Sequence, residues 1–310
     1  MAVSRFVWLI ALVAAVAGLV MTIAGAVASP GGRVAFVRFS ANVGHPRLFV
    51  LRPGGAVARE LRLPLAAVAG PAWSPDGRSL AVVGGANLPG STELTGASYL
   101  YLWRGAGLGV RRLTGRGGRV SGAAWSPNGR RIVFVRSVGG SLSSLWTVGV
   151  GGGRSRRVTA GGIDLEPSWS PDGHSIAFVR VDPKSYRSGI WLVRPDTGGL
   201  RPILAGVKNA TEPVWSPDGA HLLVENGRAL YSVRPDGSGL RRIARLAADS
   251  RGAIEDPQAA WSPDGSWIAF CQMRVGAVGR SDLWLVGADG SGLRRLTRAP
   301  ELDTDPSWGP

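Results

Sequence analysis

The chain has 310 residues, of which 45% are hydrophobic, 46 are glycine and 21 are proline, and it carries a formal net charge of +15. This composition suits short strands joined by many tight turns, and it excludes a helical bundle and a disordered chain. The charge is almost all arginine, since Lys184 and Lys208 are the only lysines. A basic chain raises nucleic acid as a partner, but no stacking aromatic residues alternate with these arginines, so none is expected.

An uncharged apolar run from Phe6 to Ala28 follows Arg5. It is long enough to span a bilayer as a helix, and it ends in Ala26-Val27-Ala28, a pattern typical of signal cleavage sites. Residues 1–28 are therefore predicted to be a cleaved signal peptide or a retained transmembrane helix. Either one predicts an exported, periplasmic or otherwise extracytoplasmic protein, which stays in the cytoplasmic membrane if the helix is kept.

A five-residue motif, Trp-Ser-Pro-Asp-Gly, recurs along the rest of the chain, with Asn128 replacing the Asp in one copy and the last copy ending at Pro310. The tryptophans are 44 to 52 residues apart, and such a period in a strand-rich chain is the sign of a propeller. We predict that all six are structural and pack one sheet against the next. They are Trp73, Trp125, Trp169, Trp215, Trp261 and Trp308.

Each repeat is expected to form four strands. The first holds the tryptophan, the second is an Ile-Ala-Phe-Val run, the third carries an aromatic residue and the fourth carries an arginine pair. The third-strand aromatics are predicted to be Phe49, Trp103, Trp146, Trp191, Tyr231 and Trp284. If the fourth strand is outermost, its charge would discourage pairing with other chains.

The first repeat opens at Val34 without a tryptophan strand in front of it, and the strand of Trp308 supplies what is missing. Closure of a ring by both chain ends removes the open sheet edges. The expected fold is therefore all-β: one six-bladed propeller over residues 31–310, in which the C-terminal strand completes the first blade.

The repeated Trp-Ser-Pro-Asp-Gly-x-x-Ile-Ala-Phe-Val, as at Trp169 to Val179, resembles the WD-repeat-like units of the TolB-like β-propeller family. The resemblance covers nearly the whole chain after residue 28 and implies a propeller that works in the cell envelope. TolB also carries an α/β domain ahead of its propeller, and the segment before the first repeat here is too short to hold one.

Motifs of catalysis are missing from the sequence. There is no G-x-S-x-G, no H-E-x-x-H and no lysine in a phosphate-binding loop. His45, His174 and His221 are scattered over three repeats. No catalytic residue, cofactor or metal is predicted, and the single Cys271, within an apolar run, is expected to be a buried thiol.

Strand alternation predicts two different faces. Turns between the first and second strands and between the third and fourth strands fall on one face, the tight-turn face; the longer, irregular connections fall on the other, the loop face. Variable loops on a regular scaffold are where recognition usually lies.

Carboxylates collect at the loop face. Three residues before the successive tryptophans stand Gly70, Gly122, Glu166, Glu212, Gln258 and Asp305, and two residues further back stand Asp164, Asp256 and Asp303. The candidate ligand-binding set, at the mouth of the central channel, is Asp164, Glu166, Glu212, Asp256, Gln258, Asp303 and Asp305. These side chains could bind a cationic peptide, hold a hard cation, or only satisfy backbone groups where the inner strand starts.

The sequence thus favours a monomeric, non-enzymatic exported propeller that binds a protein or peptide in the cell envelope. One alternative is a metal-dependent hydrolase or lyase with Asp164, Glu166, Glu212 and Asp305 as ligands. Another is a membrane-tethered sensor or accessory domain, which requires that the helix within residues 6–28 is kept.

Overall fold

The structure is a computed structural model that describes residues 30–39, 45–55, 57–87, 94–105, 109–138, 142–204, 210–226, 229–246, 258–273 and 280–310. The chain divides into two compact units, Met1–Pro30 and Gly31–Pro310. The predicted signal peptide or membrane helix lies outside the described residues. Among the residues that are described, every regular element is a strand, and none forms a helix that could cross a membrane.

The first repeat of the Gly31–Pro310 unit is built from both of its ends. It consists of β24 (Leu302–Gly309), β1 (Arg33–Phe39), β2 (Arg47–Leu51) and β3 (Arg59–Glu60). The second and third repeats follow in chain order as β4 (Ala67–Trp73), β5 (Leu80–Asn87), β6 (Leu94–Trp103) and β7 (Val110–Arg112), then β8 (Arg119–Trp125), β9 (Arg131–Ser137), β10 (Ser143–Gly149) and β11 (Arg156–Arg157).

The remaining three repeats keep the same four-strand plan. The fourth is β12 (Ile163–Trp169), β13 (Ile176–Val181), β14 (Ser188–Val193) and β15 (Leu200–Leu204). The fifth is β16 (Thr211–Trp215), β17 (Leu222–Glu225), β18 (Ala229–Val233) and β19 (Arg241–Arg245). The sixth is β20 (Ala259–Trp261), β21 (Trp267–Met273), β22 (Ser281–Gly287) and β23 (Arg294–Arg295).

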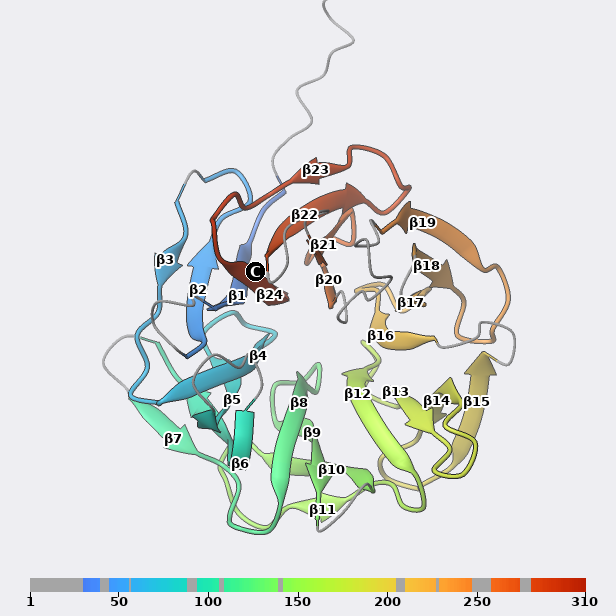
Figure 1. The fold of residues 1–310 in the computed structure, drawn as a ribbon. Coiled ribbons are helices and arrows are strands. Elements are labelled where there is room, and N and C mark those ends of the chain that lie inside the picture. Colours follow the sequence, from blue (N-terminus) through green and yellow to red (C-terminus); the bar gives the residue numbers. More distant parts are fainter. Residues whose placement is uncertain are drawn as a thin grey trace, which may run out of the picture. The chain divides into compact units, whose positions relative to one another are not determined.

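In all six repeats the neighbouring strands pair antiparallel, and in five of them they follow sequence order. In the first repeat the C-terminal strand β24 pairs with β1, which sets Trp308 opposite Val34. One parallel bridge, Ser143 to Ile163, joins the third and fourth repeats into a single eight-stranded sheet. Figure 1 shows the first strands of the repeats around a common centre and the fourth strands at the rim, with β24 beside the blue strands of the N-terminal end.

The tight turns explain why the motif recurs. In the fourth repeat Ser170 Oγ donates to Asp172 Oδ1 at 2.5 Å, and the backbone N–H groups of His174 and Ser175 donate to Asp172 and Ser170. Gly173 takes a φ of +73°, which a residue with a side chain adopts only at a cost. The side chains replace the ladder hydrogen bonds that the backbone loses where it reverses direction.

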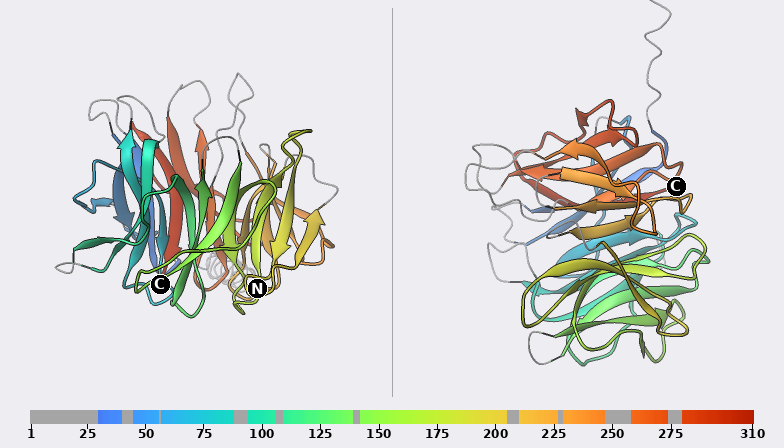
Figure 2. Two further views of the ribbon diagram at one scale, coloured as in Figure 1. Left: turned by 90° about the horizontal axis from the view of Figure 1, so that it is seen from below. Right: turned by 90° about the vertical axis from the view of Figure 1, so that its right-hand side faces the viewer.

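Both kinds of tight turn lie on one face, as the alternation predicts. Arg131, which opens a second strand, forms an ion pair of 3.2 Å with Asp196 in the turn between a third and a fourth strand. Figure 2 views the unit from the side, with its strands running from one face to the other.

Six clusters of buried apolar residues form the core, and each lies between two repeats that are neighbours in Figure 1. One of them joins the sixth repeat to the first through Ala269, Leu285 and Trp308. The repeat tryptophans are buried at four of the six junctions and half-buried at the others, Trp125 and Trp215. Each repeat tryptophan lies in, or packs against, the cluster between its own repeat and the preceding one, so it packs one sheet against another.

One aromatic position differs from the sequence expectation. In five repeats the aromatic predicted for the third strand pairs with the central residue of the second strand, as Trp191 does with Phe178. In the second repeat Tyr101, not Trp103, occupies this position opposite Val82. Trp103 lies two residues further along the same strand, so the alternation keeps it on the same side of the sheet.

The outer arginines do more than carry charge. Arg111 donates to the carbonyls of Val150 and Gly151 in the next repeat. Arg241 does the same with Ala288 and Asp289 at 2.7 and 3.1 Å. The first arginine of these pairs therefore connects the rim of one repeat to a turn of the next.

Candidate functional site

The inner strands enclose a cavity of about 480 Å³ along the centre of the Gly31–Pro310 unit. Every repeat contributes the segment that leads from the loop face to its tryptophan turn. Of the six residues that stand three positions before a tryptophan, four are polar and two are glycine. They are Glu166, Glu212, Gln258 and Asp305, and all four line the cavity together with Gly70 and Gly122.

The backbone has an unusual conformation at this position. Glu166, Glu212 and Asp305 have φ values of 53°, 52° and 54°, in the left-handed region, and Gly70 and Gly122 have 50° and 45°. The inner strand bulges here, since the pairing register shifts between Leu165 and Ser168 and at the matching place in other repeats. Glycine adopts this conformation without strain, whereas a residue with a Cβ pays for it.

The carboxylates at this position hold the neighbouring repeat. Oε2 of Glu166 accepts a hydrogen bond from the backbone N–H of Glu212 at 2.7 Å. Oδ2 of Asp305 accepts one from the N–H of Gly70 at 2.9 Å. The sequence had left open whether these acids satisfy backbone groups, and at both junctions they do so across the boundary between repeats.

Two serines add a second layer of such contacts. Ser168 and Ser307, each just before its tryptophan, accept hydrogen bonds from the backbone N–H groups of Trp215 and Trp73 at 3.2 and 3.0 Å. The acid and the serine thus fix two successive levels of the inner strands. The carboxylates are therefore placed on a rigid frame.

The structure places Asp164 and Asp303 differently from the sequence expectation. Both have 0% exposure and neither lines the central cavity. Asp164 forms two hydrogen bonds with Arg180, at 2.7 and 2.9 Å, and Asp303 forms two with Arg38 at the same distances. The bulge at Glu166 interrupts the alternation of side chains, so a residue two positions earlier does not continue the channel-lining side.

Burial raises the pKa of Asp303, and the paired Arg38 acts in the opposite direction. A carboxylate without water in contact needs its arginine partner to stay ionised. Asp164 and Asp303 are thus occupied by internal ion pairs. Asp256 lies outside the described residues.

The sequence does carry a signal for these ion pairs that the expectation missed. Arg180 and Arg38 both stand two residues after the phenylalanine of the second strand, in Phe178-Val179-Arg180 and Phe36-Val37-Arg38. Antiparallel register sets each arginine opposite the aspartate five residues before the tryptophan. Cross-strand pairs of opposite charge are common in sheets, and this spacing could have identified them.

Of the four carboxylates considered as metal ligands, Glu166, Glu212 and Asp305 line the central cavity and Asp164 does not. Within the described part of the chain, no three His, Cys, Asp or Glu side chains form a group that could hold a metal ion. Asp164 in particular faces Arg180. Cys271 is buried, and burial raises the pKa of its thiol well above its ordinary value.

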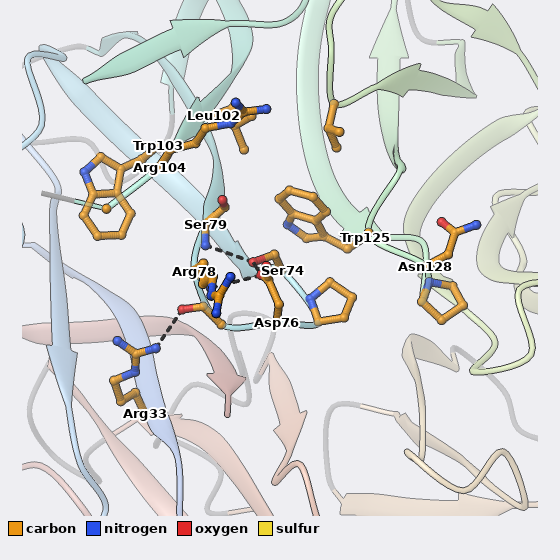
Figure 3. A pocket seen from close by; sticks show the side chains of 16 residues that line it. Arg33, Ser74, Asp76, Arg78, Ser79, Leu102, Trp103, Arg104, Trp125 and Asn128 are labelled. Atoms are coloured by element: carbon orange, nitrogen blue, oxygen red, sulfur yellow. Dashed lines mark hydrogen bonds between the residues drawn. The ribbon is translucent and has the colours of Figure 1, made fainter. Parts of the chain in front are cut away.

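A second hollow, of about 1120 Å³, lies on the tight-turn face between the second and third repeats. Figure 3 shows Trp125 and Trp103 on its walls and Arg33 reaching toward the turn of Asp76, where its Nη2 donates to Gly77 O at 2.7 Å. The turn of the third repeat after Val150 consists of glycines, and glycines bring no side chain that could fill this space. In the next repeat Asp196 reaches back to Arg131 instead.

The sequence matches the family described as the TolB beta propeller domain over residues 12–258. The chain belongs to this family. A Tol-Pal system protein TolB from Anaeromyxobacter dehalogenans is 35% identical over 127 residues, which are 39% of this chain and 27% of that protein. The aligned part thus spans about a quarter of the length of that curated relative.

Solved structures agree on the fold. The crystal structure of TolB from Acinetobacter baumannii superposes with a TM-score of 0.72 at 19% identity, covering 89% of this chain and 66% of that one. An oligogalacturonate lyase in complex with manganese superposes with a TM-score of 0.53 at 15% identity, covering 88% of this chain and 75% of that one. The likeness reaches proteins with different activities and therefore establishes only the TolB-like propeller architecture.

Proposed function

We propose that the Gly31–Pro310 unit is a non-enzymatic binding module that takes a protein or peptide segment at the loop-face end of its central channel. The contact would be made by Glu166, Glu212, Gln258 and Asp305, and a segment that carries lysine or arginine would complement the carboxylates.

The observation that carries this proposal is the placement of three carboxylates at strained backbone positions. Gly70 and Gly122 take the same conformation at no cost, so the strand bulge does not require an acidic residue. Strain held by a rigid surrounding is common at binding sites. Glu166 and Asp305 each accept a backbone hydrogen bond from the neighbouring repeat, and a serine layer already ties the same strands.

The proposed scaffold is a closed ring of six blades that acts as a monomer. The six inter-repeat clusters and the pairing of β24 with β1 support it. Closure leaves only short, charged outer strands at the rim, which disfavours edge pairing with other chains.

The proposed location is the periplasm or another extracytoplasmic compartment. The apolar run from Phe6 to Ala28 and the name of the Tol-Pal relative support it. Mass spectrometry of the mature N-terminus separates a cleaved signal from a retained helix: retention would favour the tethered sensor or accessory domain.

Capture from cell-envelope extract tests the proposal on the full chain. The first variant, Glu166→Gln with Glu212→Gln, keeps an oxygen acceptor for the backbone N–H and removes only charge. The second, Glu166→Lys with Glu212→Lys, reverses the charge. We expect a cross-linked partner identified by mass spectrometry to be captured less by the first and least by the second, with thermal unfolding of the first unchanged.

A matched control is Asp196→Lys with Asp236→Lys, at exposed positions of the fourth and fifth repeats, which makes the same charge change on the tight-turn face. It should leave capture intact. Equal capture by wild type and by both channel variants would refute the proposed face. Stoichiometric metal in the wild-type protein, lost in the glutamine variant, would favour the metal-dependent hydrolase or lyase instead.

A further inference from the structure

Three repeats carry the same cation in the same aromatic setting. Arg38, Arg136 and Arg180 lie with their guanidinium carbons 5.4, 5.3 and 5.3 Å from the ring centres of Phe36, Phe134 and Phe178. A third-strand aromatic flanks each one, and for Arg136 this is Trp146 at 4.8 Å. Stacking on aromatic faces fixes the plane of a guanidinium before any partner arrives.

Two of the three arginines have a carboxylate in front of them. Nε and Nη2 of Arg180 both donate to Asp164, and those of Arg38 both donate to Asp303. Such two-point pairing matches the planar fork of arginine to the planar carboxylate.

The third arginine has a valine in the corresponding place. Val120 pairs with Arg136 in the sheet register as Asp164 pairs with Arg180. The surrounding contacts confirm the equivalence of the positions, because Ser98 Oγ donates to Val120 O at 2.8 Å and Ser143 Oγ donates to Asp164 O at 2.8 Å. Only the carboxylate is missing.

Arg136 therefore lacks the hydrogen-bond acceptor that Arg180 and Arg38 have. Nε of Arg136 is buried and has no hydrogen-bond partner, and burial lowers the pKa of Arg136. Within the described residues, no carboxylate forms an ion pair with it. The residue is nonetheless half-buried and not sealed, and an arginine remains charged at neutral pH.

The neighbourhood favours an anion from outside. Arg119 and Arg116, the first in the same strand as Val120 and the second in the turn before it, are exposed. This sector of the loop face belongs to the third repeat, whose channel position is Gly122 and not an acid. The described part of this sector therefore presents arginine side chains at its surface and has no acid at its channel position.

We propose that Arg136 is a carboxylate-binding site: the solvent-facing edge of its half-buried guanidinium accepts an acidic side chain or a C-terminal carboxylate of a partner protein, the group that Arg180 and Arg38 receive internally from Asp164 and Asp303 in the fourth and first repeats. The site is separate from the acidic channel end and does not depend on it. A partner that touches both would present acidic groups to the third repeat and basic groups to the channel.

The test is NMR of the arginine Nε–Hε groups in the full chain, with Arg136 assigned through Arg136→Lys. The probes are sodium acetate, the capped peptide acetyl-Gly-Glu-Gly-amide for a side-chain carboxylate, and acetyl-Gly-Gly-Gly for a C-terminal one. We expect saturable shifts at Arg136 with these carboxylates. Arg180 and Arg38, whose Nε groups are already bonded, serve as internal controls and should not move.

Sodium chloride at equal ionic strength and acetyl-Gly-Gln-Gly-amide are the control probes. An equal shift at Arg136 with either of them would mean an adventitious ion or nonspecific contact only and would overturn the proposal. Absence of any saturable shift would overturn it as well. A response to only one of the two peptides would support the site and identify which kind of carboxylate it takes.

Val120→Asp supplies the missing carboxylate from within. It should make Arg136 as insensitive to acetate as Arg180 and should have a higher thermal midpoint than Val120→Asn, which has equal size without charge and should leave the acetate response of Arg136 in place. If Val120→Asp does not fold, Arg136→Lys is the alternative test, because it keeps the positive charge but removes the planar guanidinium that binds a carboxylate at two points. The ammonium signal of the lysine introduced by that substitution should show at least a tenfold weaker acetate response, and an undiminished response would contradict a two-point carboxylate site.

Discussion

The backbone N–H of Glu212 donates to Oε2 of Glu166 at 2.7 Å, so a carboxylate of the fourth repeat holds the inner strand of the fifth. Glu166 itself has a φ of 53°. One residue thus combines a stabilising hydrogen bond with a conformation that costs free energy. Substitutions can separate these two effects from any role in binding.

A series at Glu166 distinguishes them. Glu166→Ala loses the hydrogen bond and keeps the strain, so it should lower the free energy of unfolding by about 1–2 kcal/mol. Glu166→Gly loses the same bond but relieves the left-handed conformation, and should be about 1 kcal/mol more stable than the alanine variant. Glu166→Gln keeps an oxygen acceptor for the N–H of Glu212, so its free energy of unfolding should stay close to that of wild type. Urea unfolding measures all three, and equal stability of the alanine and glycine variants would contradict the strain.

The sequence was sufficient to locate this position but not its neighbours. The tryptophan period fixed the inner strands, and counting three residues back reached Glu166, Glu212, Gln258 and Asp305, which all line the cavity. Counting five residues back led to Asp164, which does not line the cavity. The count assumed that side chains alternate regularly between the two sides of the strand, and the bulge at Glu166 breaks this alternation. A bulge at a non-glycine residue leaves no mark in the hydrophobic pattern, and its effect is visible only in the pairing register.

The same limit applies to contacts between repeats. The arginine pairs of the fourth strands are visible in the sequence, and the structure places those strands at the ends of the sheets, as predicted. That Arg241 reaches the carbonyls of Ala288 and Asp289 depends on the angle between adjacent sheets. Periodicity within one repeat contains no information on that angle.

The ion pair of Asp164 and Arg180 should behave as a buried pair. Asp164 has 0% side-chain exposure and Arg180 has 15%. Asp164→Ala should therefore cost about 3 kcal/mol, at the lower end of the range for a broken buried pair because Arg180 can still reach water.

Replacement of both partners is the informative control. Asp164→Val with Arg180→Leu should recover most of the loss, since no unpaired charge remains. A double-mutant cycle by thermal or urea unfolding gives the coupling between the two residues. Additive effects of the two single changes would mean that the pair is not coupled.

Acid should destabilise the protein through its tight turns. The hydrogen bond from Ser170 is the main cause that lowers the pKa of Asp172, and the equivalent serines lower the pKa of Asp76, Asp218 and Asp264. A carboxyl whose folded-state pKa lies below its unfolded value stabilises the fold above the unfolded value, near 3.9, and this contribution is lost as pH falls through the folded pKa.

The third repeat shows how to remove this pH dependence. There Asn128 accepts the hydrogen bond of Ser126 at 2.8 Å without a charge. Changing the four turn aspartates to asparagine should leave the thermal midpoint at pH 7 little altered and should flatten its fall between pH 4 and pH 2.5. A fall as steep as that of wild type would place the acid-sensitive groups elsewhere.

Trp169 should contribute more to stability than any turn residue. It is buried in the cluster between the third and fourth repeats, and its indole N–H has no hydrogen-bond partner. Trp169→Ala should cost about 3–5 kcal/mol, the usual range for a buried aromatic side chain. Trp169→Phe loses area but no hydrogen bond and should cost about 1–2 kcal/mol. Tyr186→Ala, at a side chain that is 76% exposed, should change little, so a thermal midpoint that is the same for Trp169→Ala and Tyr186→Ala would contradict the packing role of the repeat tryptophan.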